Sequence, residues 1–317
     1  MEWLLAPLAL LIERITGYPP ALFRLIGHPV TWIGALIGWF EGRLNRGASR
    51  RARGVLMLVL LVLTVLAVGL IVVSVTRRIP FGWVIEALLA STLLAQKALG
   101  HAVKAVADAL GRDLMAGRAA VSQIIGRDPD ELDQAGVSRA AIESLAESTS
   151  DGVLAPAFWL LVGGLPGILI YKAVNTADSM VGHRNERYGQ FGWASARFDD
   201  LLNLVPARLT ALLIAAASFF VRRADAEQAW SIALRDAAKH ESPNAGWPEA
   251  AFAGALAFRL GGPRSYEGEV HQLPTFGDGR VDLGPSDILK GLELYWMALN
   301  LLLAVTIGVA LLLWRFV

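Results

Sequence analysis

A run of 22 residues without a charged side chain, from Gly54 to Val75, constrains this chain more than any other feature. A helix of that length just crosses the hydrocarbon core of a bilayer. A similar run extends from Leu294 to Phe316, with Arg315 near its end. Only 18% of all residues are charged, against about 25% in soluble domains, and the mean hydropathy is +0.48. The sequence therefore predicts a polytopic integral membrane protein.

Three weaker apolar segments lie between these strong spans, at 83–99, 153–174 and 204–221. The second is interrupted by Gly163 to Gly167, which predicts either a re-entrant hairpin or a kink in one crossing helix. Helical spacing of apolar residues recurs elsewhere, and the stretch from Ser265 to Ser286 reads as an irregular loop. We expect one all-α, membrane-embedded enzyme domain over residues 1–317, with helical cytoplasmic segments.

Basic residues indicate the orientation. Five arginines between Arg43 and Arg53 precede the first strong span, whereas only Arg77 and Arg78 follow it, which predicts that the first side is cytoplasmic. If 83–99 crosses back, residues 100–152 are cytoplasmic as well. Arginine is the main cation of the chain, which suits anionic ligands but also fits a high-GC genome.

Composition also excludes several functions. The chain has no cysteine, so it has no disulfide, catalytic thiolate or iron–sulfur cluster. Its net charge of +1 gives no field that would attract nucleic acid. It has no P-loop motif, so any nucleotide must be bound in another way.

Polar residues cluster inside or beside the apolar segments, where they are costly and therefore functional candidates. One cluster follows helical spacing and comprises Lys97, His101, Lys104, Asp108 and Arg112. It is either an anion-binding stripe or the solvated face of an amphipathic helix. If it binds an anion, Lys104→Ala should raise KM more than it lowers kcat.

A second cluster stacks the carboxylates of Glu143, Glu147 and Asp151 on one helical face. Without compensation three such anions repel one another, and a divalent cation or arginine partners would relieve the repulsion. Mg²⁺ commonly takes one or two carboxylates together with phosphate oxygens. The alternative is an acidic face exposed to solvent.

Three further clusters follow along the chain. They contain Asn175, Asp178, Arg184, Asn185, Glu186 and Arg187, then Asp199, Asp200, Asn203 and Arg208, then His240, Asn244, Trp247 and Glu249. Gly182 leaves room for a close approach within the first of them. If 204–221 crosses the membrane once, the last cluster lies on the opposite side, and we nevertheless predict that both regions meet in one cavity.

Four long strings resemble the CobD/CbiB family of cobalamin biosynthesis. They are HPVTWIGALIGWFEGRLNR, GVSRAAIESLAESTSDGVLAPAFW, YKAVNTADSMVGHRNERYGQFGWASARFDDLLNLVPARLTA and HESPNAGWPEAAFAGALAFRLGGPRSY. The resemblance extends from about His28 to the end of the chain. Ser148 and His183 depart from the usual family residues, which are asparagine and an aromatic residue.

The resemblance implies an adenosylcobinamide-phosphate synthase of the bacterial inner membrane. Such an enzyme joins a propionate carboxylate of adenosylcobyric acid to 1-amino-2-propanol or its phosphate, with ATP as co-substrate and Mg²⁺ as cofactor. It also implies a corrinoid partner, the lipid bilayer, other membrane enzymes of cobalamin assembly and a cytoplasmic active site.

The clusters supply groups for that chemistry. We expect the catalytic acids and bases to be Glu143, Glu147, His101, Asp178 and Glu186, with His240 as an alternative base, and the Mg²⁺ ligands to be Glu147, Asp151, Asp178, Asp199 and Asp200. Substrate and phosphate binding falls to Lys104, Arg112, Asn175, Arg184, Asn185, Arg187, Asn203, Arg208, His240, Asn244, Trp247 and Glu249. A Mg²⁺-dependent prenyl- or phosphotransferase and a membrane transporter are the competing interpretations.

Overall fold

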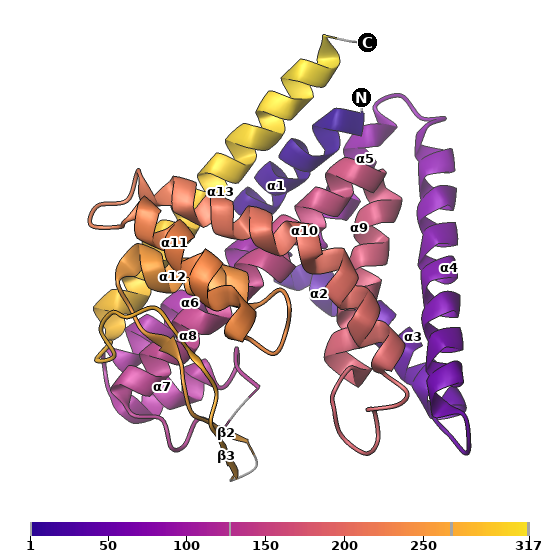
Figure 1. Ribbon diagram of the computed structural model, residues 1–317. Coiled ribbons are helices and arrows are strands. Elements are labelled where there is room, and N and C mark those ends of the chain that lie inside the picture. Colours follow the sequence, from indigo (N-terminus) through magenta and orange to yellow (C-terminus); the bar gives the residue numbers. More distant parts are fainter. Residues whose placement is uncertain (1, 127, 267–268, 316–317) are drawn as a thin grey trace. The chain divides into compact units, whose positions relative to one another are not determined.

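The computed structural model describes residues 2–126, 128–266 and 269–315, and these residues are mostly helical (Figure 1). The chain divides into two compact units. Unit 1 comprises residues 1–95, 155–203 and 306–317, and unit 2 comprises residues 96–154 and 204–305. Each unit is therefore built from segments that are far apart in the sequence.

Unit 1 contains η1 (Glu2–Leu4), α1 (Leu5–Thr16), α2 (Pro20–Ile26), α3 (Pro29–Leu44), α4 (Arg50–Thr76), α5 (Gly82–Ser91) and α9 (Ala155–Val181). Unit 2 contains α6 (Gln96–Leu110), α7 (Leu114–Val121), α8 (Gln134–Thr149), η2 (Ser150–Leu154), α11 (Ala226–Asp236), η3 (Ala237–Lys239) and α12 (Gly246–Leu256). Both α10 (Trp193–Ser218) and α13 (Pro285–Trp314) contribute residues to the two units.

Five helical segments in the described part of the chain are long and apolar enough to cross a membrane. They are Pro20–Leu44, Arg50–Thr76, Gln134–Val181, Trp193–Ser218 and Pro285–Trp314. The two strong spans expected from the sequence are among them, and the weaker segments 153–174 and 204–221 overlap two more. The segment Pro20–Leu44 was missed because Arg24, Glu41 and the interior Pro29 obscure its apolar character.

The segment 83–99 does not form one membrane-length helix. Helix α5 ends at Ser91 and α6 begins only at Gln96, so the segment is broken in the middle. The ten residues of α5 extend about 15 Å, roughly half the thickness of the hydrocarbon core. The polar residues Ser91, Thr92 and Gln96 mark the break in the sequence.

Helix α9 reverses direction at Gly164. This glycine has a φ of 58° and a ψ of −153°, outside the helical region. A Cβ atom on Gly167 would lie 2.3 Å from the Trp159 carbonyl oxygen, although eight residues of straight helix would separate the two by about 12 Å. The Gly/Pro segment at 163–167 therefore turns a helical hairpin, while its re-entrance into a membrane stays a prediction.

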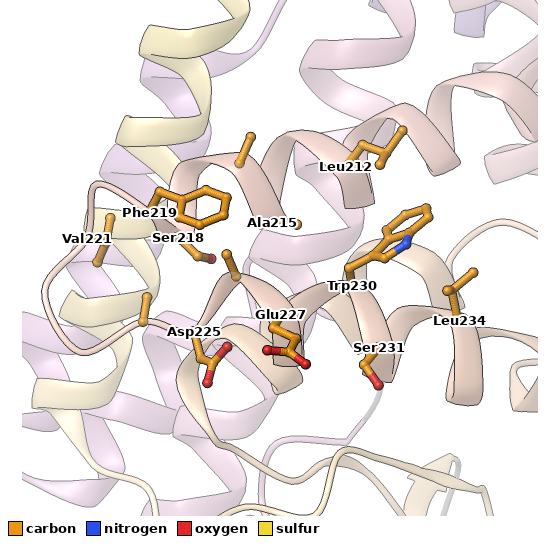
Figure 2. A pocket seen from close by; sticks show the side chains of 13 residues that line it. Leu212, Ala215, Ser218, Phe219, Val221, Asp225, Glu227, Trp230, Ser231 and Leu234 are labelled. Carbon is orange, nitrogen blue, oxygen red and sulfur yellow. The ribbon is translucent and has the colours of Figure 1, made fainter.

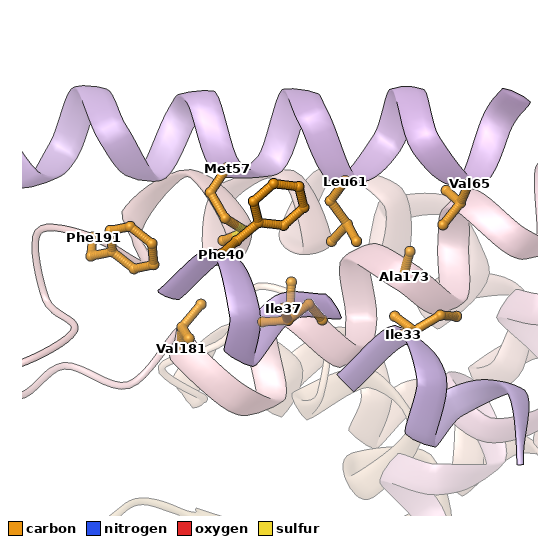
Figure 3. Close-up of a cluster of buried hydrophobic side chains, with 10 residues drawn as sticks. Ile33, Ile37, Phe40, Met57, Leu61, Val65, Ala173, Val181 and Phe191 are labelled. Carbon is orange, nitrogen blue, oxygen red and sulfur yellow. The ribbon is translucent and has the colours of Figure 1, made fainter. Parts of the chain in front are cut away.

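The core of unit 1 forms where α3, α4 and α9 pack together (Figure 3). Its buried side chains include Ile37 from α3, Leu61 from α4 and Val181 from α9. A Cβ atom on Gly54 would lie 1.8 Å from the Phe191 carbonyl oxygen, so glycine is required where α4 passes this backbone. This packing fixes the end of α9 from which the polar residues of the site project.

Unit 2 packs α6 against α7 and α8, and α11 against α12. The last pair crosses closely, because a Cβ on Gly254 would lie 2.3 Å from the Gln228 carbonyl oxygen.

The stretch from Ser265 to Ser286, expected to be an irregular loop, takes part in two short antiparallel strand pairs, and β1 lies just before it. β1 (Leu260–Gly261) pairs with β4 (Thr275–Phe276), and β2 (Arg264–Tyr266) pairs with β3 (Glu269–His271). Strands of two or three residues are too short for an alternating pattern to be visible in the sequence. Residues 267–268 of that stretch lie outside the described residues.

Candidate functional site

The centre of the candidate site in unit 1 is the carboxylate of Asp199 on α10. Its Oδ1 accepts a hydrogen bond from Asn175 Nδ2 at 3.4 Å, and its Oδ2 accepts one from Asn203 Nδ2 at 2.9 Å. Asp199 is 8% exposed and Asn203 is 1% exposed. Spacing of four residues places Asp199 and Asn203 on the same face of α10. A buried carboxylate is thus held by two neutral amides.

Two residues that the sequence analysis missed complete this arrangement. Tyr171 donates a hydrogen bond from its hydroxyl to Asn203 Oδ1 at 3.0 Å, and Lys172 donates one from Nζ to Asn175 Oδ1 at 3.3 Å. These contacts fix the orientation of both amides toward Asp199. A lysine inside an apolar helix is a signal that could have identified this position from the sequence.

Two further carboxylates neighbour Asp199. The charges of Asp178 and Asp200 both act on it, and Asp200 lies 3.7 Å from the Arg197 guanidinium. Asp178 is half-buried, and a Cβ atom on Gly182 would lie 1.9 Å from its Oδ1. The close approach predicted at Gly182 is therefore confirmed, since only glycine leaves room for this carboxylate.

The donor set of this cluster suits a hard cation, because carboxylate and amide oxygens are ligands that Mg²⁺ accepts. Among the described residues, however, no three carboxylate or imidazole groups already have the arrangement of a metal site. The residues fit Mg²⁺ by chemistry, with phosphate oxygens to complete its coordination. The magnesium site stays a prediction.

A second cluster lies in unit 2 around Arg208. Its Nη1 donates to Asn244 Oδ1 at 3.2 Å and to the Leu204 carbonyl at 2.8 Å, and its guanidinium lies 4.8 Å from the centroid of the Trp247 ring. Two of the sequence clusters, at 199–208 and 240–249, thus meet through Arg208, Asn244 and Trp247. A planar cation on an aromatic face remains able to bind an anion through its remaining N–H groups.

His240 and Glu249 lie beside this cluster. Nε2 of His240 is 3.6 Å from Glu249 Oε1, and Glu249 is 1% exposed. Nδ1 of His240 accepts a hydrogen bond from the Ser242 amide at 2.9 Å, so that nitrogen carries no proton and its lone pair is occupied. This geometry favours a positioning role for His240 over the role of base.

The three stacked acids of unit 2 differ in their surroundings. Glu143 is buried, and its Oε1 accepts a hydrogen bond from the Gly261 amide at 2.7 Å, which ties α8 to β1. Glu147 is exposed and Asp151 is partly exposed. One oxygen of Glu143 therefore serves the fold, while the predicted catalytic and metal-binding roles of the three acids stay predictions.

The basic stripe on α6 lies on the exposed face of an amphipathic helix. Lys104 forms an ion pair with Asp108 at 2.6 Å, and both side chains are more than half exposed. His101 and Arg112 are exposed as well. The ion pair favours the interpretation of a solvated face, although anion binding by this stripe stays a prediction.

The loop that follows α9 carries four more predicted residues. Arg187 forms a two-pronged contact with Glu41 of α3, at 3.1 to 3.3 Å. Asn185 Oδ1 accepts a hydrogen bond from the Tyr188 amide at 2.9 Å, which shapes the loop. The side chains of Arg184 and Glu186 are exposed.

A hollow of about 970 Å³ lies between the end of α10 and α11 (Figure 2). Its walls are mostly apolar and include Leu212, Phe219, Trp230 and Leu234. Asp225 at its edge accepts a hydrogen bond from the Gln228 amide and so caps α11. None of the site residues expected from the sequence lines this hollow.

The structure thus defines an α-helical protein with membrane-length helices and a polar cluster centred on a buried carboxylate. A sequence profile described as CobD/Cbib protein matches residues 6–295. The chain belongs to the CobD/CbiB family.

Bacterial relatives support this assignment. A Rhodobacter capsulatus protein is 51% identical over 308 residues, which cover 96% of this chain and 95% of the relative. A Brucella suis protein is 47% identical over 312 residues, and a Rhizobium meliloti protein is 46% identical over 307 residues, with 94% to 96% of each chain covered. Each is named cobalamin biosynthesis protein CobD. No solved structure matches the chain.

Proposed function

We propose that this protein acts in cobalamin biosynthesis as an ATP-dependent acid–amine ligase. It joins a propionate carboxylate of adenosylcobyric acid to 1-amino-2-propanol or its phosphate, and the product is adenosylcobinamide or its phosphate. The observation that carries the proposal is the buried Asp199 carboxylate between Asn175 and Asn203, in a chain whose relatives are named for cobalamin biosynthesis.

The chemistry explains why such a cluster is needed. A carboxylate is a poor electrophile at neutral pH, so one of its oxygens first attacks the γ-phosphorus of ATP and ADP leaves. The amine nitrogen then attacks the acyl carbon, phosphate leaves, and the nitrogen loses a proton. Bound Mg²⁺ would offset the charge of the phosphates. Each step develops negative charge that fixed protein groups must stabilise.

The residues of unit 1 take separate parts in this proposal. Asp199 and Asp200 would hold the cation, with Asn175 and Asn203 fixing the Asp199 carboxylate. Asp178 is less deeply buried, which suits the acid that accepts the amine proton. Arg184 would bind phosphate oxygens.

In unit 2, Arg208 offers an oriented guanidinium for an anionic group of a substrate, because Asn244 and Trp247 hold it in place.

We further propose that the protein resides in the bacterial inner membrane. The arginines between Arg43 and Arg53 then face the cytoplasm, which is the compartment that supplies ATP.

The test is a reaction with purified full-length protein in detergent. Adenosylcobyric acid, ATP, Mg²⁺ and either amine are incubated, and products are identified by mass. The expected product has the mass of the two substrates less one water, with one ADP formed per amide. Lack of this product under conditions where a homologous enzyme is active would overturn the proposal. Corrinoid movement into liposomes without a new product would instead indicate a transporter, and a polyprenyl product would indicate a prenyltransferase.

A further inference from the structure

A small hollow of about 330 Å³ lies in unit 1 where α3 ends and α4 begins. Its lining residues are Glu41, Gly42, Asn45, Arg46, Arg50 and Arg187. We propose that this hollow binds a phosphate group. The proposal concerns binding alone, and its test measures binding without turnover, so it can fail or succeed separately from the amide-forming reaction.

The charges in the hollow do not balance. Three guanidinium groups and one carboxylate line it. Arg187 is paired with Glu41 at 3.1 Å, so the charges of Arg46 and Arg50 remain without a carboxylate in the lining. Arg50 donates only to the Glu186 carbonyl at 3.3 Å, and within the described residues the Arg46 guanidinium has no hydrogen-bond partner. A hollow with this excess of positive charge favours an anion.

The walls of the hollow are fixed by Asn45. Its Nδ2 donates to Glu41 Oε1 at 3.1 Å and to the Arg187 carbonyl at 3.2 Å. These bonds join the end of α3 to the loop after α9, across 142 residues of sequence. The backbone that carries Arg187 is therefore fixed beside Arg46 and Arg50, and guanidinium groups suit a tetrahedral oxyanion because they donate in pairs.

The start of α4 adds to the attraction. This helix has 27 residues and begins at Arg50, and the preceding Ser49 makes no side-chain hydrogen bond to cap it. The first backbone N–H groups of a helix have no partner within the helix and carry partial positive charge. Such an uncapped end beside two arginines favours phosphate binding.

Neighbouring arginines in the same segment are arranged differently. The guanidinium of Arg43 lies 3.9 Å from the centroid of the Trp39 ring, and that of Arg51 lies 3.8 Å from the Trp193 ring. Neither residue lines the hollow. The basic segment therefore contains arginines that stack on aromatic rings and arginines that face the hollow, and only the second kind should recognise the ligand.

The phosphate group has two possible sources. The hollow lies between the membrane-length segments Pro20–Leu44 and Arg50–Thr76, where lipid headgroups would be within reach. A soluble phosphate compound offers the same chemistry. Both sources present a tetrahedral anion to the same guanidinium groups, so the experiment must separate them.

The first arm measures soluble phosphate. The melting midpoint of purified protein in neutral detergent is followed as inorganic phosphate is added at constant ionic strength. If the source is a soluble phosphate compound, we expect a saturable rise for the wild type, and an apparent Kd at least tenfold weaker for Arg46→Gln. Arg43→Gln is the matched control, because it removes the same charge from a stacked arginine outside the hollow, and its Kd should stay within twofold of wild type.

The second arm measures lipid. The same three proteins are placed in nanodiscs of phosphatidylcholine alone or mixed with phosphatidylglycerol. If the source is lipid, phosphatidylglycerol raises the midpoint of wild type and Arg43→Gln but not of Arg46→Gln, and soluble phosphate has little effect. Equal responses of Arg46→Gln and Arg43→Gln in both arms would overturn the proposal. Arg46 is exposed, so its substitution should leave the fold intact.

Discussion

Two buried carboxylates in this protein have opposite kinds of partner. Asp236 in unit 2 is fully buried and binds the Arg235 guanidinium at 2.7 Å, the Lys239 amine at 2.7 Å and the Gly277 amide at 2.8 Å. Asp199 in unit 1 is 8% exposed, and its hydrogen-bond partners among the described residues are the amides of Asn175 and Asn203. One carboxylate is neutralised by cations, and the other is only oriented.

The electrostatics of Asp236 follow from its partners. Burial alone would raise the pKa of this carboxyl, but the hydrogen bonds from Arg235, Lys239 and Gly277 lower its pKa well below the ordinary value. The pKa of Arg235 is raised in turn, mainly by its hydrogen bonds to Asp236 and Asp278. Asp236 therefore stabilises the fold as an anion. The difference teaches that Asp199, held without a cation, is the carboxylate available to bind one.

The largest effect should come from Asp199→Asn. The change keeps the shape and removes the charge, so turnover should fall about a thousandfold, or about 4 kcal/mol of transition-state stabilisation. The melting midpoint should change little, because no cationic partner is left behind. Turnover is measured by mass in the ligase assay, with thermal unfolding of the same preparation. A turnover within tenfold of wild type would show that this carboxylate is not part of the site.

Asp236→Asn should show the reverse pattern. The change weakens the hydrogen bonds that Arg235, Lys239 and the Gly277 amide donate to a buried carboxylate, which together are worth about 3 kcal/mol, although Arg235 keeps Asp278 as a partner. We expect a clearly lower melting midpoint, while turnover per folded molecule at a permissive temperature stays near that of wild type. If Asp236→Asn instead retains its midpoint and loses turnover, the contrast between the two carboxylates fails.

Glu147→Gln tests whether the stacked acids of α8 contribute to catalysis. If Glu147 contributes to a Mg²⁺–phosphate site, Mg²⁺-dependent turnover should fall about a hundredfold, near 3 kcal/mol. Corrinoid binding should survive, because the ring does not need the metal. Normal turnover at low Mg²⁺ would show that this acidic face is structural. Asp178 and Asp199 would then be the main candidates for the Mg²⁺ site.

The pH dependence of stability separates the two carboxylates in another way. Because the pKa of Asp236 is lower in the folded state, its contribution is fully present above the unfolded pKa of about 3.9 and is lost as the pH falls toward the folded value. The gap in midpoint between wild type and Asp236→Asn should be constant from pH 7 to pH 5 and should shrink below about pH 4. A gap that stays constant at pH 3 would contradict this role.

The sequence was sufficient for the parts of the site that depend on spacing along one helix. Asp199 and Asn203 are four residues apart, and Gly182 is four residues after Asp178, so helical geometry alone brings each pair together. The apolar composition of two long segments likewise identified the strong spans, because only a long apolar helix can cross a bilayer.

Other features depend on contacts between distant segments and could not be read from the sequence. Nothing near Trp159 indicates that its Nε1 donates to the Leu202 carbonyl, or that Tyr171, twelve residues later, reaches Asn203. Both contacts follow from the reversal at Gly164, and the sequence did not decide between a hairpin and a kink at this position. The hydrogen bond from the Gly261 amide to Glu143, 118 residues away, is of the same kind.

The smallest effect should come from Lys104→Ala. This change tests whether a charge that is paired on the surface, like the paired charge of Asp236, has no part in substrate binding. Lys104 already has its counterion in Asp108, and both side chains are exposed, so an exposed pair of this type contributes about 0.5 kcal/mol or less. We expect KM for each anionic substrate to stay within twofold and the melting midpoint to shift only slightly. Asp108→Ala is the matched control, since it breaks the same pair and leaves the cation. If Lys104→Ala raises KM several-fold while Asp108→Ala does not, Lys104 binds an anion despite its ion pair, and the stripe on α6 belongs to the substrate site.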